Sequence, residues 1–408
     1  MITRKTLYTV LMLGACYLQQ SCSKQADVPN PQIQDSVPEE HPQENPLANY
    51  PENRETASTI YIVSMYPATL YAFNAIDGKQ KWSVQMDGDF GTSVLAIGGV
   101  VTFIGETNTI QAYDTSGNKK WTFDLPQRYN DRPLVADHGT ILAETLDYIF
   151  AVNASDGQQK WKLTKPVLPG HQQVGRISVL DGMVYTTGSG IPVAVDIATG
   201  QIKWQMNEVN SLSNMVVYKN LIYGTDGKNL IVADPETGTV INTYADVLES
   251  DDVNVKYGRI YQSSGNVLDS ADPSKKMPRI QACSQANFEA LWKCPILGDG
   301  KAIGVLGVSD AMSGASYCEP FFQPDTRMEK GWFAGSTYVN GILYYTSAKR
   351  LTYDGDGNPI YFSELYAFDV NNKKSKWRTV IPDDDIYNQV PCVVTKEGST
   401  FRSIETFR

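Results

Sequence analysis

The side chains that most often carry catalysis are scarce in this chain. It contains three histidines, His41, His138 and His171. A zinc site built from histidines needs several of them close together, and a Ser-His-Asp triad would have to use His138 or His171. His138 lies in an Asp-His-Gly segment that is typical of a turn. We therefore interpret these histidines as solvated turn or loop residues.

Paired carboxylates are the next candidates for catalysis, because two of them can serve as acid and base or nucleophile in glycoside hydrolysis. The conspicuous acidic runs are Asp251-Asp252 and Asp383-Asp384-Asp385. Folding could bring distant carboxylates together, but runs of this kind are typical of solvated loops. We predict no catalytic residues and expect the protein not to be an enzyme.

One segment has the alternating oxygen side chains that suit a hard cation. It is Asp354-Gly355-Asp356-Gly357-Asn358, and it lacks the downstream bidentate Glu of a calcium loop. A glycine-rich hairpin tip explains the same residues. We therefore predict no metal site.

The six cysteines fall into two groups. Leu13-Gly14-Ala15-Cys16 resembles a bacterial lipobox, and Cys22 is a second candidate for lipidation, with Gln19 where a lipobox prefers Leu. Cys283, Cys294, Cys318 and Cys392 remain for the mature domain. An oxidising compartment would allow one or two disulfides among these four, and the sequence does not choose their pairing.

The first 57 residues are not expected to belong to the folded domain. Arg4 and Lys5 precede an apolar run over residues 7–15 that is too short to span a bilayer, so we interpret residues 1–22 as an export signal of the lipoprotein type. Residues 23–57 are rich in Pro, Gln and Glu, and cannot bury enough apolar surface to fold. They predict a disordered tether, followed by one domain over residues 58–408.

Composition and charge restrict what this domain can bind. Hydrophobic residues make up 42% of the chain, which is enough for a sizeable core. The net charge of −10 argues against nucleic acid, whose binding needs a basic surface. It also argues against a basic patch for anionic lipid, so contact with a membrane is expected through the lipid anchor only.

A repeat of small residue, Asx, glycine and tryptophan sets the architecture. Ala72 leads through Asn74 and Gly78 to Trp82, and the distance from Ala to Trp is ten residues in five units and nine in another. Six of the seven tryptophans occupy this position and are expected to be structural: Trp82, Trp121, Trp161, Trp204, Trp292 and Trp377. A copy over residues 232–238 lacks the Trp. The Asx residue is expected to hydrogen-bond the backbone of the turn that follows it, which explains its place before the glycine.

Hairpin signals precede the repeats. Gly98-Gly99, Asp181-Gly182 and Asn340-Gly341 each separate two β-rich runs, and such pairs favour tight turns with positive φ. Each repeat therefore predicts four antiparallel strands, which is one blade of a β-propeller. We expect an all-β fold, a single propeller of four-stranded blades, with seven blades preferred and eight possible. A long insertion is expected near residues 295–334.

The first unit begins on what looks like a second strand. We expect the C-terminal segment around Cys392 to supply its missing inner strand and so close the ring, which removes the exposed sheet edges.

The repeats resemble the tryptophan-docking motif of the quinoprotein family, the PQQ-like repeat, over about residues 58–394. Two kinds of relative differ in function. Quinoprotein dehydrogenases bind PQQ and calcium and use a disulfide between adjacent cysteines, but this chain has no Cys-Cys pair and no Cys-x-x-Cys-His haem motif. The chain is more similar to the BamB family of outer-membrane assembly lipoproteins, which implies a scaffold without a cofactor.

In an up-and-down blade, the turns from strand one to two and from three to four lie at one end, and they are short here. The long connections all fall at the opposite end, and long loops are often functional. They are expected over residues 262–278, 295–334 and 348–362, with shorter ones over 126–132 and 169–174. Aromatic and arginine side chains of these connections suit a partner interface or sugar stacking, although they could instead pack the insertion onto the domain. The candidates are Trp332, Phe322, Tyr353, Tyr129, Arg132 and Tyr387.

We therefore predict a monomeric, non-catalytic lipoprotein of the outer membrane, on its periplasmic or surface side. It would bind an envelope protein as a scaffold. A surface glycan-binding propeller and, third, a small quinoprotein dehydrogenase stay open as alternatives.

Overall fold

The computed structural model describes residues 54–402 and 405–407, with gaps, all within one compact unit, Asn45–Arg408. From residue 253 to 336 it describes the course of the backbone strands and not the side chains. The predicted signal and tether lie outside the described residues. The longer gaps are 87–93, 127–133, 166–176, 246–252, 269–275, 285–289, 296–307, 310–315, 318–330, 354–358 and 383–389.

The described part of the chain folds into β-strands arranged as antiparallel sheets. It contains six sheets of four strands, one of six and one of two. No helix of the described residues has the length and hydropathy of a membrane span. The prediction of an all-β chain built from four-stranded units is confirmed at this level.

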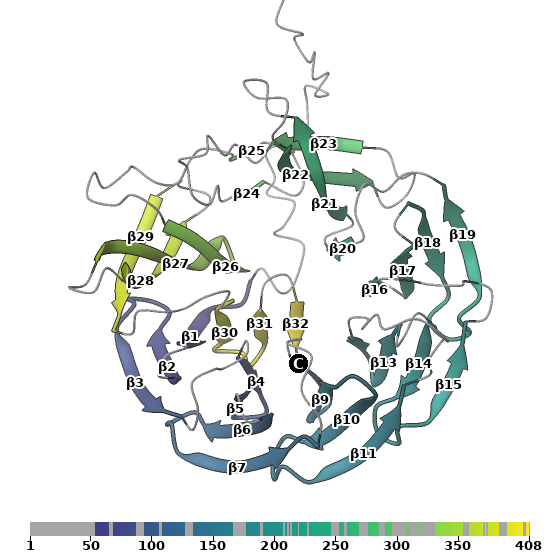
Figure 1. Cartoon of the computed structure of the whole chain (residues 1–408), viewed down its shortest axis with the longest axis horizontal. Coiled ribbons are helices and arrows are strands. Elements are labelled where there is room, and N and C mark those ends of the chain that lie inside the picture. The colour runs from purple at the N-terminus through teal and green to yellow at the C-terminus, as the bar shows by residue number, and fades with distance from the viewer. Residues whose placement is uncertain are drawn as a thin grey trace, which may run out of the picture. The chain divides into compact units, whose positions relative to one another are not determined.

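After the first three strands of the chain, three four-stranded sheets follow one another, and the strands of each pair in chain order (Figure 1). The first contains β4 (Leu95–Ile97), β5 (Val100–Ile104), β6 (Thr109–Asp114) and β7 (Lys119–Asp124). The second contains β8 (Val135–Asp137), β9 (Thr140–Glu144), β10 (Tyr148–Asn153) and β11 (Gln159–Thr164). The third contains β12 (Ser178–Leu180), β13 (Met183–Thr186), β14 (Val193–Asp196) and β15 (Ile202–Gln205).

Three more four-stranded sheets and a short two-stranded sheet complete the later part of the chain. One contains β16 (Asn214–Tyr218), β17 (Leu221–Thr225), β18 (Leu230–Ala233) and β19 (Val240–Tyr244). The next contains β20 (Val253–Lys256), β21 (Arg259–Leu268), β22 (Lys276–Ser284) and β23 (Ala290–Pro295). The last contains β26 (Gly331–Val339), β27 (Ile342–Tyr353), β28 (Pro359–Asp369) and β29 (Lys374–Ile381), and β24 (Val308–Ser309) pairs with β25 (Ser316–Tyr317).

The two ends of the described chain meet in the six-stranded sheet, whose order is β3-β2-β1-β30-β31-β32. Its strands are β1 (Ala57–Val63), β2 (Thr69–Asn74), β3 (Gln80–Gln85), β30 (Cys392–Thr395), β31 (Thr400–Arg402) and β32 (Glu405–Phe407). β30 pairs with β1 in the register Tyr61↔Cys392, so the predicted pairing between the two chain ends is present. The two further strands β31 and β32 were not predicted from the sequence.

Two predicted long connections are wrong, because the strands extend into them. The segment 348–362 is mostly strand: β27 runs to Tyr353 and β28 starts at Pro359, with Tyr353 paired to Pro359. Likewise β21 and β22 occupy much of 262–278. Cross-strand pairing of alternating residues outweighs the local turn signals there.

The tight turns follow the sequence prediction. At Gly98-Gly99, His138-Gly139, Asp181-Gly182 and Asn340-Gly341 both central residues have positive φ, between 46° and 79°. This is the conformation of a type I′ turn, whose twist matches that of the flanking strands.

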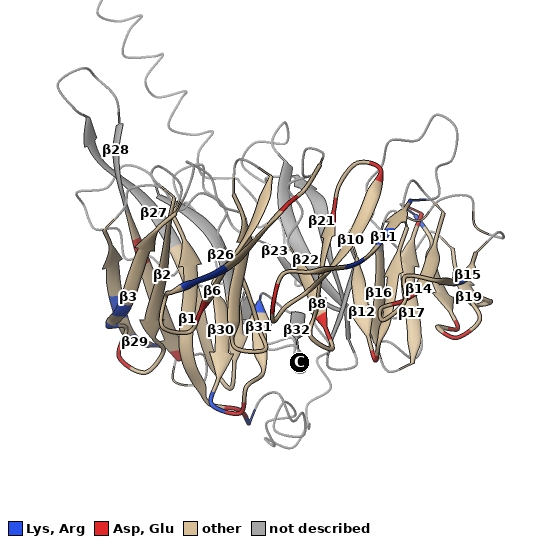
Figure 2. Cartoon of the chain, turned by 90° about the horizontal axis from the view of Figure 1, so that it is seen from below, with Lys and Arg blue, Asp and Glu red and all other residues tan. Residues whose placement is uncertain are grey.

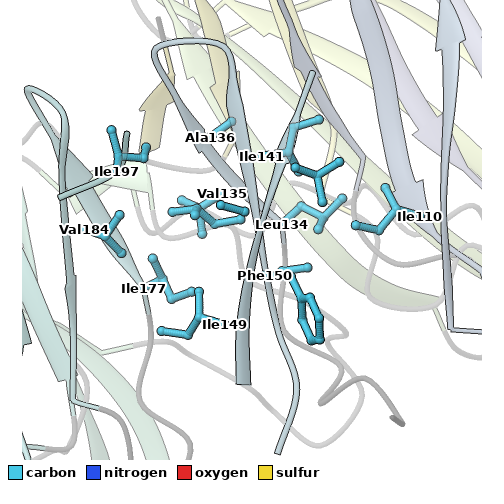
Figure 3. Close-up of a cluster of buried hydrophobic side chains, with 14 of the residues drawn as sticks. Ile110, Leu134, Val135, Ala136, Ile141, Ile149, Phe150, Ile177, Val184 and Ile197 are labelled. Carbon is cyan, nitrogen blue, oxygen red and sulfur yellow. The ribbon is translucent and has the colours of Figure 1, made fainter. Parts of the chain in front are cut away.

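The core lies between neighbouring sheets. In one large cluster, Ile149 of β10 and Ile177, just before β12, are buried together with Val184 of β13 (Figure 3). Neighbouring sheets also contact through their first strands: β4 contacts β8, β8 contacts β12, β12 contacts β16, and β16 contacts β20. β26 contacts β30 and β31, which in turn contact β4.

The repeat tryptophans join each sheet to the next one. The indole Nε1 of Trp161 in β11 donates a hydrogen bond of 2.7 Å to the carbonyl of Ile197, in the turn after β14. The same bond is made by four other indoles, to Thr115, Ala154, Pro235 and Ala75: those of Trp82, Trp121, Trp204 and Trp377. The side chain of Trp292 is outside the described residues, although its register opposite Ala282 matches the other repeats.

Each of these five described indoles covers the glycine of the following sheet, a contact that was not predicted from the sequence. A Cβ on Gly200 would lie 2.7 Å from Trp161, and a Cβ on Gly78 would lie 2.5 Å from Trp377. Gly200 also has a φ of +73°, which disfavours any other residue. Two features therefore require glycine at this position of the repeat: the positive φ of its backbone, and the indole that leaves no room for a Cβ.

Candidate interaction surfaces

At the tight-turn end of the sheets, acidic side chains close the turns between third and fourth strands. The Asp196 carboxylate accepts hydrogen bonds from the backbone amides of Ala198 and Thr199, both at 3.0 Å. Asp234 and Asp114 do the same in their own turns. Figure 2 shows acidic residues at strand ends and basic colouring at the lower end of the outer strand β3. The predicted role of the repeat Asx residue in binding the turn backbone is confirmed.

These bonds make the domain sensitive to acid. Backbone amides hold the pKa of Asp77, Asp196 and Asp234 below the usual 3.8, and the Asn118 side chain does so for Asp114. A lowered pKa in the folded state contributes stability that is present above 3.8 and is lost as the pH falls through the folded-state values. We expect the midpoint of urea unfolding to drop between about pH 5 and about pH 3, and Asp114→Asn to reduce that drop. An unchanged midpoint would contradict this explanation.

At the opposite end, the turn between β9 and β10 is closely held. Tyr148 N donates to Thr145 Oγ1 at 3.1 Å, and Thr145 N donates to the Tyr148 carbonyl at 2.9 Å. Leu146 at the tip is 55% exposed. Lys162 Nζ lies 3.4 Å from the centre of the Tyr148 ring, a cation–π contact.

A buried ion pair lies next to this turn and is hydrogen-bonded to its backbone. Lys165 Nζ lies 3.1 Å from Glu144 Oε1 and donates a 2.6 Å hydrogen bond to the Thr145 carbonyl, and the exposed fractions of the Lys165 and Glu144 side chains are 0% and 2%. Sequence reasoning missed this pair. In four other sheets the position equivalent to Lys165, at the end of the outer strand, holds a buried apolar residue: Met86, Leu125, Met206 and Ile381. A lysine at a position that is otherwise apolar was the signal in the sequence that could have indicated the buried pair.

The structure places the predicted binding residues unevenly. Trp332 and Tyr353 were predicted in loops and lie instead on β26 and β27, opposite Ala348 and Pro359. Their side chains lie outside the described residues, as do Phe322, Tyr129, Arg132 and Tyr387 altogether. Their grouping into one surface therefore stays a prediction.

His138 lies in the turn between β8 and β9, as expected, with its Nδ1 at 2.9 Å from the Asp137 carboxylate. The same carboxylate accepts a 2.9 Å hydrogen bond from Gly182 N of the next sheet. The side chain of His138 is 64% exposed. Within the described residues, no three His, Cys, Asp or Glu side chains gather as metal ligands.

Of the four cysteines of the predicted domain, Cys392 is a buried free thiol. Burial raises its pKa to about 11. It therefore belongs to no disulfide, and its low thiolate content makes it a poor nucleophile. The side chains of Cys283, Cys294 and Cys318 lie outside the described residues, and so do Cys16 and Cys22.

Part of the chain is similar in sequence to the proteins of one family. A family model described as outer membrane protein assembly factor BamB matches residues 53–267. Curated proteins of that name are also similar: the one from Yersinia pestis is 29% identical over 199 residues, covering 45% of this chain and 50% of the relative. The one from Salmonella typhimurium is 26% identical over 242 residues, covering 43% and 62%. The chain thus spans about half the length of the curated relatives it matches.

Solved structures that match most of the chain have lower sequence identity. BamB from Moraxella catarrhalis has a TM-score of 0.45 at 13% identity, covering 83% of this chain and 92% of that one. The computationally designed Ika8 protein has a TM-score of 0.46 at 12% identity, covering 86% and 97%.

Proposed function

This chain belongs to the family described as outer membrane protein assembly factor BamB, whose model matches more than half of it, and we propose that it is a non-catalytic scaffold of the cell envelope. The observation that carries the proposal is that match over residues 53–267, together with the indole contacts that join consecutive sheets there. A rigid framework of sheets is what a binding scaffold requires, because binding residues are often carried by loops that such a framework positions.

The proposed architecture is a seven-bladed propeller. Seven sheets of four or more strands support this number among the described residues, and the pairing of β30 with β1 supports closure at the chain ends. Lipidation at Cys16 or Cys22 would attach the domain to the outer membrane through the tether of residues 23–57.

The proposed partner is another protein of outer-membrane assembly. It would bind at the end of the sheets that carries the long connections and lies opposite the tight turns, which we call the connection end. Trp332, Phe322, Tyr353, Tyr129, Arg132 and Tyr387 remain the proposed contacts. Aromatic and arginine side chains are the types that most often dominate protein interfaces.

Affinity capture tests this surface. The Trp332→Ala/Phe322→Ala variant is expected to recover less of the envelope proteins that copurify with the wild type, because it loses two aromatic anchors. Ile76→Ala is the control, since Ile76 is 61% exposed in the turn between β2 and β3, at the tight-turn end. Equal recovery by all three proteins, with unchanged circular dichroism, would overturn the proposal that the connection end binds the partner.

A further inference from the structure

The outer strands of five sheets carry a lysine at one fixed position. Each of these strands has a β-bulge at the residue before the repeat tryptophan; in β15, for example, the register passes from Ala194↔Trp204 to Val195↔Ile202, which leaves Lys203 as the extra residue. In four other sheets the bulged residue is also an exposed lysine, and these are Lys81, Lys120, Lys160 and Lys376.

A bulge with a lysine is a recognised protection of a sheet edge, because it interrupts pairing and places a charge where another strand would add. Three of these lysines also contact polar side chains of their own sheets. Lys81 and Lys160 donate hydrogen bonds of 2.6 Å to Thr59 and Thr140, and Lys203 lies 3.2 Å from Asp196.

Two outer strands depart from this pattern. In β23 the bulged residue is Leu291, and the strand still contains a lysine, Lys293. The departure of β19 is larger. Its bulge falls between Val232↔Asn242 and Ala233↔Val240, so Ile241 takes the lysine position and Asn242 takes that of the tryptophan. Ile241 is 57% exposed, and no residue of β19 is charged. Among outer strands with described side chains, β19 is the one without a lysine or arginine.

We propose that β19 is a docking edge that accepts an extended segment of a partner polypeptide as a fifth strand. β19 is the last strand of its sheet, so the backbone groups on its outer side point away from β18. Strand addition uses those groups for affinity and the exposed side chains for selectivity. This edge is separate from the connection end proposed above.

The chemistry of the edge defines the segment it takes. The strand itself is rich in β-branched residues, which favours a segment of alternating Val, Ile or Thr. Acidic residues flank it in the sequence, with Asp234 and Glu236 before it and Asp246 and Glu249 after it. An uncharged segment with lysine or arginine at its ends therefore complements β19. A second copy of this chain fits less well, because each copy carries a net charge of −10.

A labelled peptide tests the proposal on the purified full chain. The probe alternates valine and threonine over about five to six residues, the usual length of a strand, between terminal lysines. Fluorescence anisotropy is expected to show saturable binding to the wild type. Ile241→Lys, which restores the residue type of five other outer strands, is expected to weaken binding by at least about tenfold, or about 1.4 kcal/mol.

The matched control is Ile202→Lys, because Ile202 is 42% exposed on the neighbouring outer strand β15, which already has Lys203. Its affinity for the peptide should stay within about twofold of the wild type, as is usual for surface substitutions. Absence of saturable binding to the wild type, or equal weakening by both variants, would overturn the proposal.

Two further measurements identify the occupant. A peptide N-methylated on alternate amides should lose binding, because it cannot form the strand ladder; undiminished binding would show mere apolar contact and refute strand addition. Sedimentation without peptide should give the same molar mass for the wild type and Ile241→Lys. A wild-type dimer that Ile241→Lys dissociates would assign the edge to a second copy and overturn the proposed partner.

Discussion

Replacing Trp161 with alanine is expected to lower the free energy of unfolding by about 3–5 kcal/mol, the usual cost of removing a large buried aromatic side chain. Trp161 is 8% exposed, and its indole donates a hydrogen bond to the Ile197 carbonyl and covers Gly200. The loss therefore combines apolar burial, a hydrogen bond and a void between two sheets. Urea unfolding followed by fluorescence and circular dichroism measures it.

The glycine beneath the indole provides a sharper test of the same contact. Gly200→Ala should be destabilising for two reasons, the φ of +73° and the clash of its Cβ with Trp161. Gly139→Ala isolates the first reason, because Gly139 has a φ of +67° and nothing lies within 4 Å of its Cβ position. We expect Gly200→Ala to cost more than Gly139→Ala in the wild type.

The difference between the two alanine substitutions should disappear when Trp161 is also alanine, since the clash is then relieved. Such non-additivity is the measure of a direct contact. If Gly200→Ala and Gly139→Ala cost the same in both backgrounds, the indole does not press on Gly200 and the account of how the sheets are joined is wrong.

Breaking the buried ion pair is the other large effect. Lys165→Met is expected to lower the free energy of unfolding by about 3–5 kcal/mol, because it leaves the Glu144 carboxylate buried without its cation. The loss arises from that unpaired charge. It does not measure a favourable contribution of the pair, whose attraction is offset by the desolvation of both groups.

The double substitution separates these two quantities. Glu144→Val/Lys165→Met introduces the residues found at the same places in the sheet of β1. Val63 pairs there with Leu70 as Glu144 pairs with Ile149, and Met86 follows the outer strand β3 as Lys165 follows β11. We expect the double variant to be at least as stable as the wild type, since an apolar pair of similar volume often replaces a buried ion pair without loss. Double and single variants of equal stability would contradict this view.

If the double variant is as stable as expected, the pair is present for a reason other than stability. Lys165 Nζ donates to the Thr145 carbonyl and so fixes the turn that presents Leu146 at the connection end. A structural element that adds rigidity to one turn without adding stability to the fold is consistent with the proposed role of that end in binding.

The repeating features of this protein could be predicted from its sequence. Type I′ turns at Gly98-Gly99 and Asp181-Gly182 follow from the need for positive φ, and the Asx residues bind their own turns. These features depend on neighbours within a few residues, so local sequence determines them. The positions of the repeat tryptophans followed from regular spacing, because every sheet repeats the same local pattern.

Other features depend on residues that meet only after folding. Nothing in the local sequence pairs Trp161 with Gly200, because the contact joins two sheets. The hairpins of β21–β22 and β27–β28 extend beyond their turn signals because cross-strand pairing decides where a strand ends.

The sequence by itself thus determined the strand type, the turns and the repeating unit, since each rests on φ preferences and on contacts between near neighbours. Tertiary structure decided that Lys165 is buried with Glu144 as its partner and that Ile241 is exposed on a sheet edge. A lysine is ordinarily exposed and an isoleucine ordinarily buried. Only the packing of one sheet against the next determines which side chains lose contact with water.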